Sequence, residues 1–246
     1  MAVAFQAAGT DVATVTTTLA LVAPAGVAGD IFIANIMSNN NVAAIPPSAS
    51  WFAIQSYNNT AAMRHDVFIY RAGDGDGAAT FNFTVNGTTL SYGVITTYRG
   101  VPTFGSPYGA SSQSANALAD AVTYATITPR DSRSLIVACG AYNLNATTAG
   151  AMSGTNPTFT NRVDAETITG NTGSLFVYDG LSGTGVATGA RTHATTSTTD
   201  AINCGVLIEL LDVFPGGALG PGGGGAPAPR YPARKTQRVG GSSFDY

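Results

Sequence analysis

Residues able to carry acid–base or nucleophilic chemistry are few and scattered in this 246-residue sequence. His65 and His193 are the only histidines, and neither lies in a cluster with metal-ligand spacing or beside a nucleophile motif. Ser106 stands in FGSPYG, which does not form the G-x-S-x-G turn of hydrolases. No phosphate-binding or dinucleotide-binding glycine motif follows a strand-like run. We therefore predict that the protein is not an enzyme and uses no cofactor, although carboxylates distant in sequence can meet once a chain folds.

Asp74 and Asp76, in AGDGDGAAT, are close enough in sequence to suggest a calcium site. The calcium loop of an EF-hand would need ligands at the positions of Ala78 and Val85, whose side chains have no oxygen. Asp and Gly also favour the unusual dihedral angles of tight turns. The stretch therefore favours a hairpin turn without a metal, and a bound cation is the alternative.

Cys139 and Cys204 are the two cysteines, and each lies within an apolar run. Two cysteines alone make neither a disulfide framework nor a metal site. A thiol in a core strand behaves as a small apolar side chain. We expect both to be reduced and buried, and a disulfide between them is the alternative.

Trp51 is the single tryptophan, and it follows a Pro-x-x-x spacer and precedes Phe52. An aromatic ring on a loop can stack on a sugar, and Trp51, Tyr57 and Tyr108 are candidates for this role. The neighbouring apolar residues favour instead a buried Trp51 at the edge of the core.

Charged residues make up 10% of the chain, where about 25% is usual. Residues 1–214 hold seven arginines and thirteen acidic side chains, a net charge of −6, whereas residues 215–246 carry +3. A surface poor in charge suits a subunit of a large assembly. The basic tail favours an acidic protein surface as its partner, and a solvated tail is the alternative. Four basic residues with only Tyr231 among them make a short footprint for nucleic acid, so we disfavour that partner.

Neither a signal peptide nor a membrane span is expected from the sequence. The first residues, MAVAFQAAGTDVATVTTTLALVAPAGVA, lack a basic start, and threonines and Pro24 break their apolar run. The most apolar window, Leu19 to Met37, contains Pro24, Asp30 and Asn35, which a bilayer-crossing helix rarely tolerates together. We therefore expect no membrane partner.

The elements that would position any site are short runs of β-branched and aromatic residues between Gly, Asn, Pro and Asp clusters. No convincing apolar stripe with helical spacing exceeds two turns. The runs recur in the same order: DIFIANI with SLIVACG, DVFIYRAGDGDG with SLFVYDGLSGTG, and YGVITTYRGV with CGVLIELLDV. The sequence predicts an all-β protein whose two halves repeat each other.

The offset between the repeated runs grows along the chain. Three pairs show this growth: Ile31 with Leu135 at 104 residues, Phe68 with Phe176 at 108, and Gly93 with Gly205 at 112. We predict a two-sheet antiparallel β-sandwich, jelly-roll-like, built from two tandem degenerate copies at about 13–102 and 121–214 with a linker at 103–120. Each copy should open with a further strand, Ala13 to Val22 in the first and AVTYATI, 121–127, in the second. Generic sandwich spacing without duplication is the alternative.

Residues 215–246 have no periodic apolar face and are predicted to form an extended, Gly/Pro-rich, basic C-terminal arm. A glycine spacer at 216–225 precedes a proline-rich stretch at 227–232, which favours extended polyproline geometry. Such an arm can bind a partner without folding by itself. Its candidate partner-binding residues combine positive charge with apolar anchors: Arg230, Tyr231, Arg234, Lys235, Arg238, Phe244 and Tyr246.

An ordered set of motifs resembles a known family. GDIFIANI, PPSASW, FIYRAGDG and TYRGV occur in this order, and ATGAR at 187–191 is similar to a second-copy motif of that family. Together they resemble duplicated β-sandwich proteins encoded by tailed phages and prophages, over roughly residues 29–213. The resemblance implies the sandwich fold and a virion or surface setting, and it implies no catalytic residue.

With the arm, this resemblance leads us to expect a structural protein of a bacteriophage virion that is assembled in the host cytoplasm. The first hypothesis is a head decoration or cement protein held on neighbouring subunits by its C-terminal arm. The alternative is a tail-associated or fibre protein that binds a host-surface glycan. The expected partners are other virion proteins, either capsid or tail subunits, and further copies of the chain in a homo-oligomer.

Overall fold

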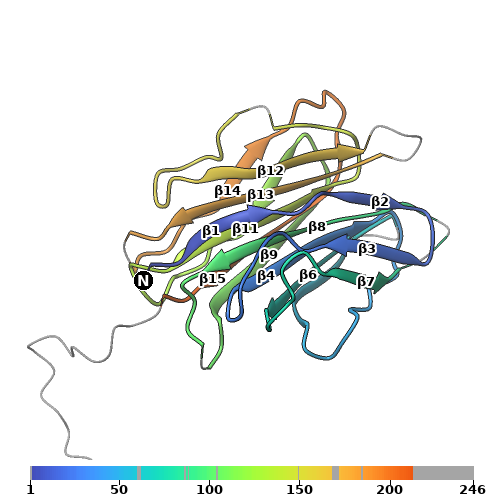
Figure 1. Ribbon diagram of the computed structural model, residues 1–246. Helices are drawn as coiled ribbons and strands as arrows, with labels where there is room; N and C mark the ends of the chain where they lie inside the picture. The colour runs from blue at the N-terminus through green and yellow to red at the C-terminus, as the bar shows by residue number, and fades with distance from the viewer. Residues whose placement is uncertain are drawn as a thin grey trace, which may run out of the picture. The chain divides into compact units, whose positions relative to one another are not determined.

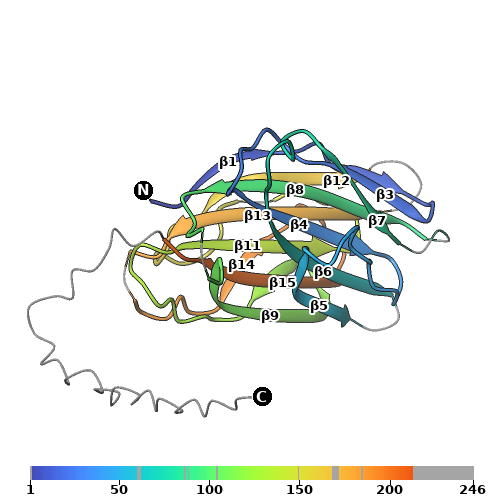
Figure 2. The same ribbon diagram turned by 60° about the horizontal axis from the view of Figure 1, so that its bottom comes forward.

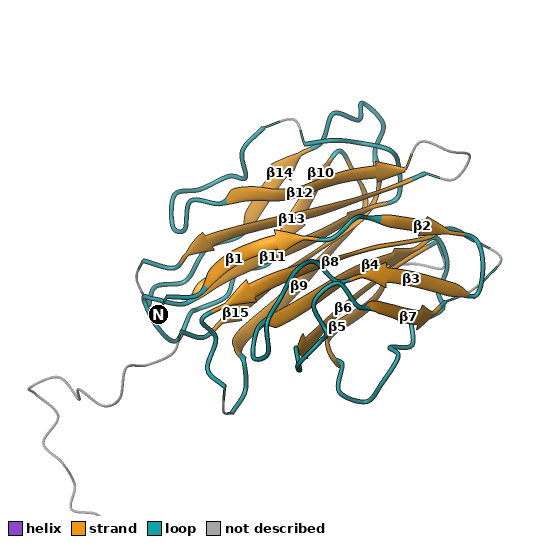
Figure 3. Cartoon of the chain, viewed as in Figure 1, coloured by secondary structure: helices purple, strands orange, loops and turns teal. Residues whose placement is uncertain are grey.

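The structure of the chain is a computed structural model that describes residues 2–59, 62–85, 87, 89–103, 105–148, 150–167, 172–183 and 185–212 (Figure 1). Every regular element in these ranges is a strand, and none is a helix (Figure 3). The prediction of an all-β antiparallel sandwich is therefore confirmed. The predicted arm, 215–246, and its seven candidate partner-binding residues lie outside the described residues.

Two antiparallel main sheets divide the chain into its two halves. The first sheet has the spatial order β1 (Ala4–Ala8), β8 (Ser91–Arg99), β4 (Ile31–Ser38), β6 (Met63–Arg71) and β5 (Phe52–Asn59), and β2 (Val12–Thr14) also pairs with β8. The second has the order β9 (Tyr108–Ala119), β15 (Ala201–Leu210), β11 (Leu135–Tyr142), β13 (Gly173–Leu181) and β12 (Thr160–Thr167). The two sheets can be followed in Figure 2, where β5 lies beside β9 and β1 lies beside β12.

Each main sheet also packs against a two-stranded sheet on its outer face. These outer sheets are β3 (Thr18–Val22) with β7 (Thr80–Thr84), and β10 (Ala121–Tyr124) with β14 (Arg191–Ala194). One buried apolar cluster fills the space between the main sheets, and two others lie under the outer sheets. The core therefore has three layers, where the sequence predicted a single inter-sheet layer.

Strand β4 explains why the central strands lack a polar alternation. Ile31 and Ile33 belong to the cluster between the main sheets, whereas Phe32 and Ala34 belong to the cluster under β3 and β7. All eight residues of β4 are buried. A strand that is covered on both faces is mostly apolar, and the two polar residues of β4, Asn35 and Ser38, are both hydrogen-bonded.

The strands of the two main sheets follow one another in the same spatial order, as the repeated sequence runs predict. Phe68 and Phe176 lie in the corresponding strands β6 and β13, and Gly93 and Gly205 lie in β8 and β15. The pairing register differs between the halves. In the second half Gly140 pairs with both Phe176 and Gly205, whereas in the first half Phe68 is opposite Ala34 and Gly93 is opposite a residue two positions further along β4. A two-residue difference keeps each side chain on its face of the sheet. A common origin of the two halves stays a prediction.

Three boundaries differ from the sequence prediction. The expected linker, 103–120, contains the twelve-residue strand β9, which pairs with β15. The expected strand over Ala13–Val22 is two strands, β2 and β3, separated by a bend. The first half also begins earlier, with β1, which pairs with β8. β1 and β9 are rich in Ala, which has low strand propensity, and tertiary pairing overrides that weak local preference.

Candidate functional site

The family-like motifs bring their polar residues together as supports of the fold. Arg99, of the TYRGV motif, donates hydrogen bonds from Nε and Nη2 to the two carboxylate oxygens of Asp30, of the GD motif, each at 2.8 Å. The backbone N–H of Val27 donates to the same carboxylate at 3.0 Å. Burial alone would raise the pKa of Asp30, but these hydrogen bonds and the Arg99 charge outweigh burial and hold the pKa below 3.8. The pair fixes the start of β4 to the end of β8.

Trp51 is a core residue, as the sequence favoured, and it is only 3% exposed. Its ring stacks on Tyr70 with centroids 4.9 Å apart and contacts Phe81 and Phe83 edge-on at 5.1 and 5.2 Å. Such aromatic contacts add to the free energy gained by burial alone. A sugar cannot reach this ring, so Trp51 is not a glycan platform.

The Asp74–Asp76 stretch is a turn, as the sequence favoured. One carboxylate oxygen of Asp76 accepts hydrogen bonds from the hydroxyl of Tyr70 at 2.7 Å and from the backbone N–H of Gly73 at 2.6 Å. These bonds tie the turn to the stacked Trp51–Tyr70 pair. Among the described residues, no group of three or more His, Cys, Asp or Glu side chains could hold a metal ion.

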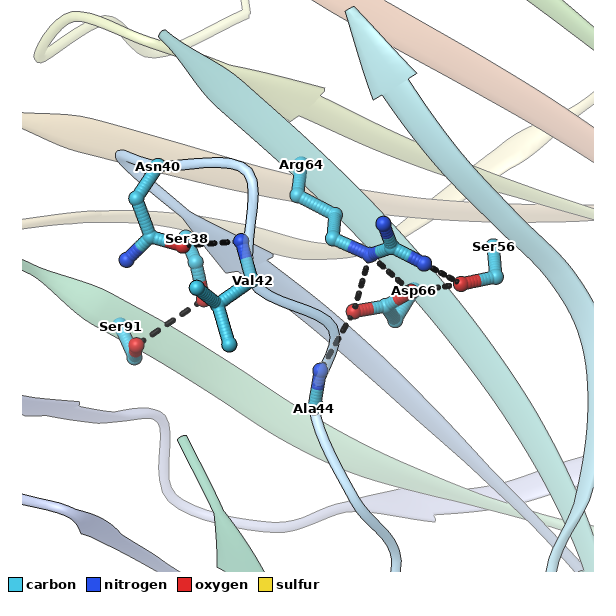
Figure 4. Close-up of polar contacts among 8 residues, drawn as sticks. All are labelled: Ser38, Asn40, Val42, Ala44, Ser56, Arg64, Asp66 and Ser91. Carbon is cyan, nitrogen blue, oxygen red and sulfur yellow. Dashed lines mark hydrogen bonds and ion pairs between the residues drawn. The ribbon is translucent and has the colours of Figure 1, made fainter. Parts of the chain in front are cut away.

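Asp66 anchors the loop between β4 and β5 (Figure 4). Its carboxylate accepts from Arg64 Nε at 3.0 Å, from the backbone N–H of Ala44 at 2.8 Å, and from the hydroxyl of Ser56. The guanidinium of Arg64 also donates to Ser56. Because Asp66 is only 1% exposed and has all these donors, it holds the loop in place and is not positioned to act on a ligand.

Two further hydrogen bonds hold the start of the same loop (Figure 4). The side-chain oxygen of Asn40 accepts from the backbone N–H of Val42 at 2.7 Å. The hydroxyls of Ser38 and Ser91 share a hydrogen bond at 2.9 Å, which joins the ends of β4 and β8. These contacts extend the same structural role along the loop.

The second half has a counterpart to the Asp66 anchor. Ser174, in β13, accepts from the backbone N–H of Ala146 at 2.8 Å and donates to the carbonyl oxygen of Leu144 at 2.8 Å. Ala146 lies in the loop that follows β11, as Ala44 lies in the loop that follows β4. A loop is thus fixed to β6 in the first half by a carboxylate and to β13 in the second half by a hydroxyl.

Both histidines are buried and neutral. His65 is 0% exposed and donates from Nε2 to the side-chain oxygen of Asn35 at 2.6 Å, between the main sheets. The amide nitrogen of Asn35 in turn donates across the core to the carbonyl oxygens of Gly140 and Phe176, each at 3.3 Å. Burial lowers the pKa of His65 to about 3. A ring held in this way cannot exchange protons with a bound substrate.

His193 belongs to β14, a strand of the second outer sheet, and its side chain lies in an aromatic cluster. Its Nδ1 shares a hydrogen bond with the hydroxyl of Tyr124 at 3.1 Å, and its ring lies 4.5 Å from Phe176 and 5.1 Å from Tyr178. The side chain is 1% exposed, and burial lowers its pKa to about 3. This histidine is therefore a core residue as well.

Glu209 is a fully buried carboxylate that looks at first like a catalytic acid. It accepts hydrogen bonds from the backbone N–H groups of Ala110 at 2.9 Å and Arg130 at 2.6 Å, and from the hydroxyl of Ser134 at 2.8 Å. Buried carboxylates need such donors, because an unpaired one would be costly. Glu209 therefore joins β15 to β9 and to the segment before β11 as part of the fold.

Both cysteines are free and buried, as predicted. Burial raises the pKa of Cys139 and of Cys204 to about 12. At neutral pH these thiols are protonated and have no access to solvent. They therefore offer no nucleophile.

The accessible concave surface lies beside the start of β5. Two adjoining hollows, of about 400 and 290 Å³, share Phe52, Gly105 and Pro107 among their lining residues. Phe52 is 65% exposed. Arg71 lines the larger hollow and Tyr108 the smaller one. We call this surface the Phe52 groove.

Arg71 gives the Phe52 groove a positive charge that the described chain does not neutralise. Its Nη1 donates to the carbonyl oxygen of Gly29 at 3.3 Å, and it has no ion pair with any described carboxylate. Partial burial lowers the pKa of Arg71, and the guanidinium stays charged at neutral pH. The groove thus offers an exposed aromatic ring, backbone polar groups and one unpaired cation.

Another hollow of the domain is a poorer candidate site. It measures about 610 Å³ and lies between β1 and β12. Its charged side chains, Arg162 and Asp179, pair with each other at 2.9 Å. They are therefore engaged before any ligand arrives.

The sequence identified part of the Phe52 groove. Tyr108 was one of the three aromatic candidates, and it lines the groove. Tyr57 instead packs partly buried against the inter-sheet cluster. Phe52 and Arg71 were not predicted from the sequence. A signal for Phe52 was present, because successive residues of an extended chain face opposite sides and a buried Trp51 therefore directs Phe52 outward.

Comparisons with protein-family models, with curated proteins and with solved structures return no match for this chain. The described residues also contain no helix long and apolar enough to span a bilayer.

Proposed function

We propose that the chain is a structural protein of a bacteriophage virion, a head decoration or cement protein that binds neighbouring subunits through its C-terminal arm. The observation that carries this proposal is the opposite charge of the two parts, −6 for residues 1–214 and +3 for residues 215–246. A basic arm on an acidic domain is attracted to acidic domains of neighbouring subunits, including other copies of the chain.

The contacts of the described domain support this proposal indirectly. The residues of the family-like motifs, such as Asp30, Trp51 and Arg99, hold strands and turns together. His65 and Glu209 have side chains of a type that can act in acid–base catalysis, but both are buried and hydrogen-bonded within the core. A domain whose polar residues maintain its fold fits a building block better than it fits an enzyme.

Locating the chain in purified particles tests the proposal. Virus particles from cells that encode the chain would be separated by density gradient, and the chain would be sought by mass spectrometry in head and tail fractions. We expect it in the head fraction, and a version lacking 215–246 should remain with the free protein. Finding the intact chain only among free proteins would contradict a virion role, and finding it in tails would favour the tail location.

A second candidate function, glycan binding by a tail or fibre protein, is favoured by the Phe52 groove. Carbohydrate sites combine an exposed aromatic ring with a few polar groups in a shallow concave surface. Phe52 supplies the ring, and Ser106 and Arg71 supply polar groups. Saturation-transfer NMR with host-surface oligosaccharides would test this function, with Phe52→Ala as the variant. Signals that persist unchanged in the variant would rule out this groove as the site.

A further inference from the structure

The two long borders of the sandwich differ in how their outer strands are protected. On one border Arg162, in β12, lies over the ring of Phe5, in β1, at 4.8 Å. On the other border Gln55, in β5, donates to the hydroxyl of Ser111, in β9, at 3.5 Å. Figure 2 shows β1 and β12 on the side of the domain opposite to β5 and β9.

Charged side chains protect the first border from pairing with another strand. β12 contains Arg162, Asp164 and Glu166, and β1 has only five residues with a break in its register. Charges, short strands and irregularities are the usual means by which proteins prevent edge-to-edge association. β9 has the sequence YGASSQSANALA, without a charged residue or a proline, and its twelve residues make it the longest strand of the described chain.

The backbone of β9 is paired on one side only. It is the last strand of its sheet, next to β15. From Ser111 to Ala115 the register with β15 is regular, opposite Ile208 to Cys204. In an antiparallel strand alternate residues direct their N–H and C=O groups to opposite sides. Half of the backbone groups of this run therefore point outward, where the described chain supplies no further strand.

The side chains of β9 do not obstruct that edge. The hydroxyl of Ser112 donates to the carbonyl oxygen of Ala125 at 2.6 Å, on the side of β10. Ala115 packs against the cluster between the main sheets, on the other face. Both faces of the strand are thus engaged with the domain. The small side chains leave the outward N–H and C=O groups of β9 accessible, and these groups can pair with those of another strand.

The distribution of charge allows a second copy of the chain to approach this edge. Two copies of a domain with a net charge of −6 repel each other wherever acidic groups meet. The β5–β9 border avoids that cost because neither strand contains a charged residue. A strand that runs antiparallel to its own copy is self-complementary about a twofold axis, since each free N–H then meets a free C=O.

We propose that the outer edge of β9 is a self-association surface, where β9 pairs antiparallel with β9 of a second copy through the run from Ser111 to Ala115. The two five-stranded sheets then become one continuous sheet across the dimer. This interface requires neither the arm nor a virion setting, so it stands or falls separately from the proposed function.

The test measures the mass of the full-length chain by size-exclusion chromatography with light scattering. The wild-type protein should be a dimer at concentrations where Ser114→Lys is a monomer, because Ser114 is one residue from the centre of the run and a lysine there brings two like charges close to the twofold axis. The matched control is Thr160→Lys, which places the same charge on the exposed start of β12 and should leave the dimer intact. A monomeric wild type, or a dimer that persists in Ser114→Lys, would overturn the proposal.

Hydrogen exchange on the wild-type protein decides the question if Ser114→Lys does not fold. Outward amides between Ser111 and Ala115 should exchange more slowly in concentrated than in dilute solution, whereas β12 amides should not change. Exchange in β9 that is independent of concentration would overturn the proposal without any variant.

Discussion

Acid should destabilise this protein through its two histidines, long before its carboxylates are protonated. His65 and His193 have a pKa of about 3 in the folded chain, against 6.5 for an exposed histidine. Below about pH 6.5 the unfolded chain binds a proton at each histidine while the folded chain does not. Folded stability is therefore unaffected above that pH and falls as the pH decreases from about 6.5 towards 3.

The size of this effect follows from the difference in proton binding. Each pH unit between the unfolded and folded pKa values costs about 1.4 kcal/mol per histidine. At about pH 5 the loss is therefore about 2 kcal/mol for each residue and about 4 kcal/mol for both. Domains are stable by only about 5–15 kcal/mol, so this loss should be easily measured. The two sites lie in different layers of the core, and their effects should add.

Urea unfolding followed by the fluorescence of Trp51 at about pH 7.5 and about pH 5 would measure the loss, since both values bracket the histidine titration. The matched variant is His65→Gln with His193→Gln, because glutamine can keep the hydrogen bonds to Asn35 and Tyr124 without titrating. The comparison is between two pH values within each protein, so a general loss of stability in the variant does not matter. If the wild type and the double variant lose the same free energy of unfolding, the histidines are not the cause and the reasoning fails.

Three further predictions test the packing and the boundary of the domain. Trp51→Ala should lower the free energy of unfolding by about 3–5 kcal/mol, measured by circular dichroism, whereas Trp51→Phe should cost clearly less; equal losses would contradict the stacked arrangement. Gly205→Ala should cost about 1–3 kcal/mol, because its Cβ would collide with the carbonyl oxygen of Thr123. Gly185→Ala should be nearly neutral in the same assay, because its Cβ would make only an ordinary van der Waals contact, 3.8 Å from the carbonyl oxygen of Pro129. Deleting Pro215–Tyr246 should leave the melting temperature close to that of the full chain, since the last strand ends at Leu210; a truncated chain that no longer folds would mean that the arm belongs to the core.

The apolar strands could be predicted from the sequence because hydrophobic runs bounded by turn residues carry a strong local signal. β4, β6, β8 and their counterparts were found in this way, and so was the order in which they recur. β9 could not be found, because SSQSANA has neither β-branched nor aromatic residues and owes its strand to pairing with β15. Two strands of the outer sheets were predicted, β3 within Ala13–Val22 and β10 within 121–127. The sheets themselves were missed, because their partner strands β7 and β14 are short and give little periodic signal.

The candidate site was less predictable than the fold. The burial of Trp51 and of the cysteines followed from their apolar neighbours in sequence. The Phe52 groove did not, because Arg71 and Gly105 come from different parts of the chain and only folding brings them together. The burial of His65 was equally hidden, since its partner Asn35 lies in another strand.

The hydrogen bonds from Asn35 across the core have a consequence for how the halves of the chain find each other. The layer between the sheets is otherwise largely apolar, and apolar packing alone stabilises many alignments of the two sheets nearly equally. The carbonyl oxygens of Gly140 and Phe176 accept from Asn35 in only one alignment of the two sheets. During synthesis, when several nascent chains are close together, a first half that met another first half would bury Asn35 without these acceptors, at a cost of about 1–3 kcal/mol per unsatisfied group. The hydrogen bonds of Asn35 therefore favour packing of the first half against the second half over packing of two first halves from different chains.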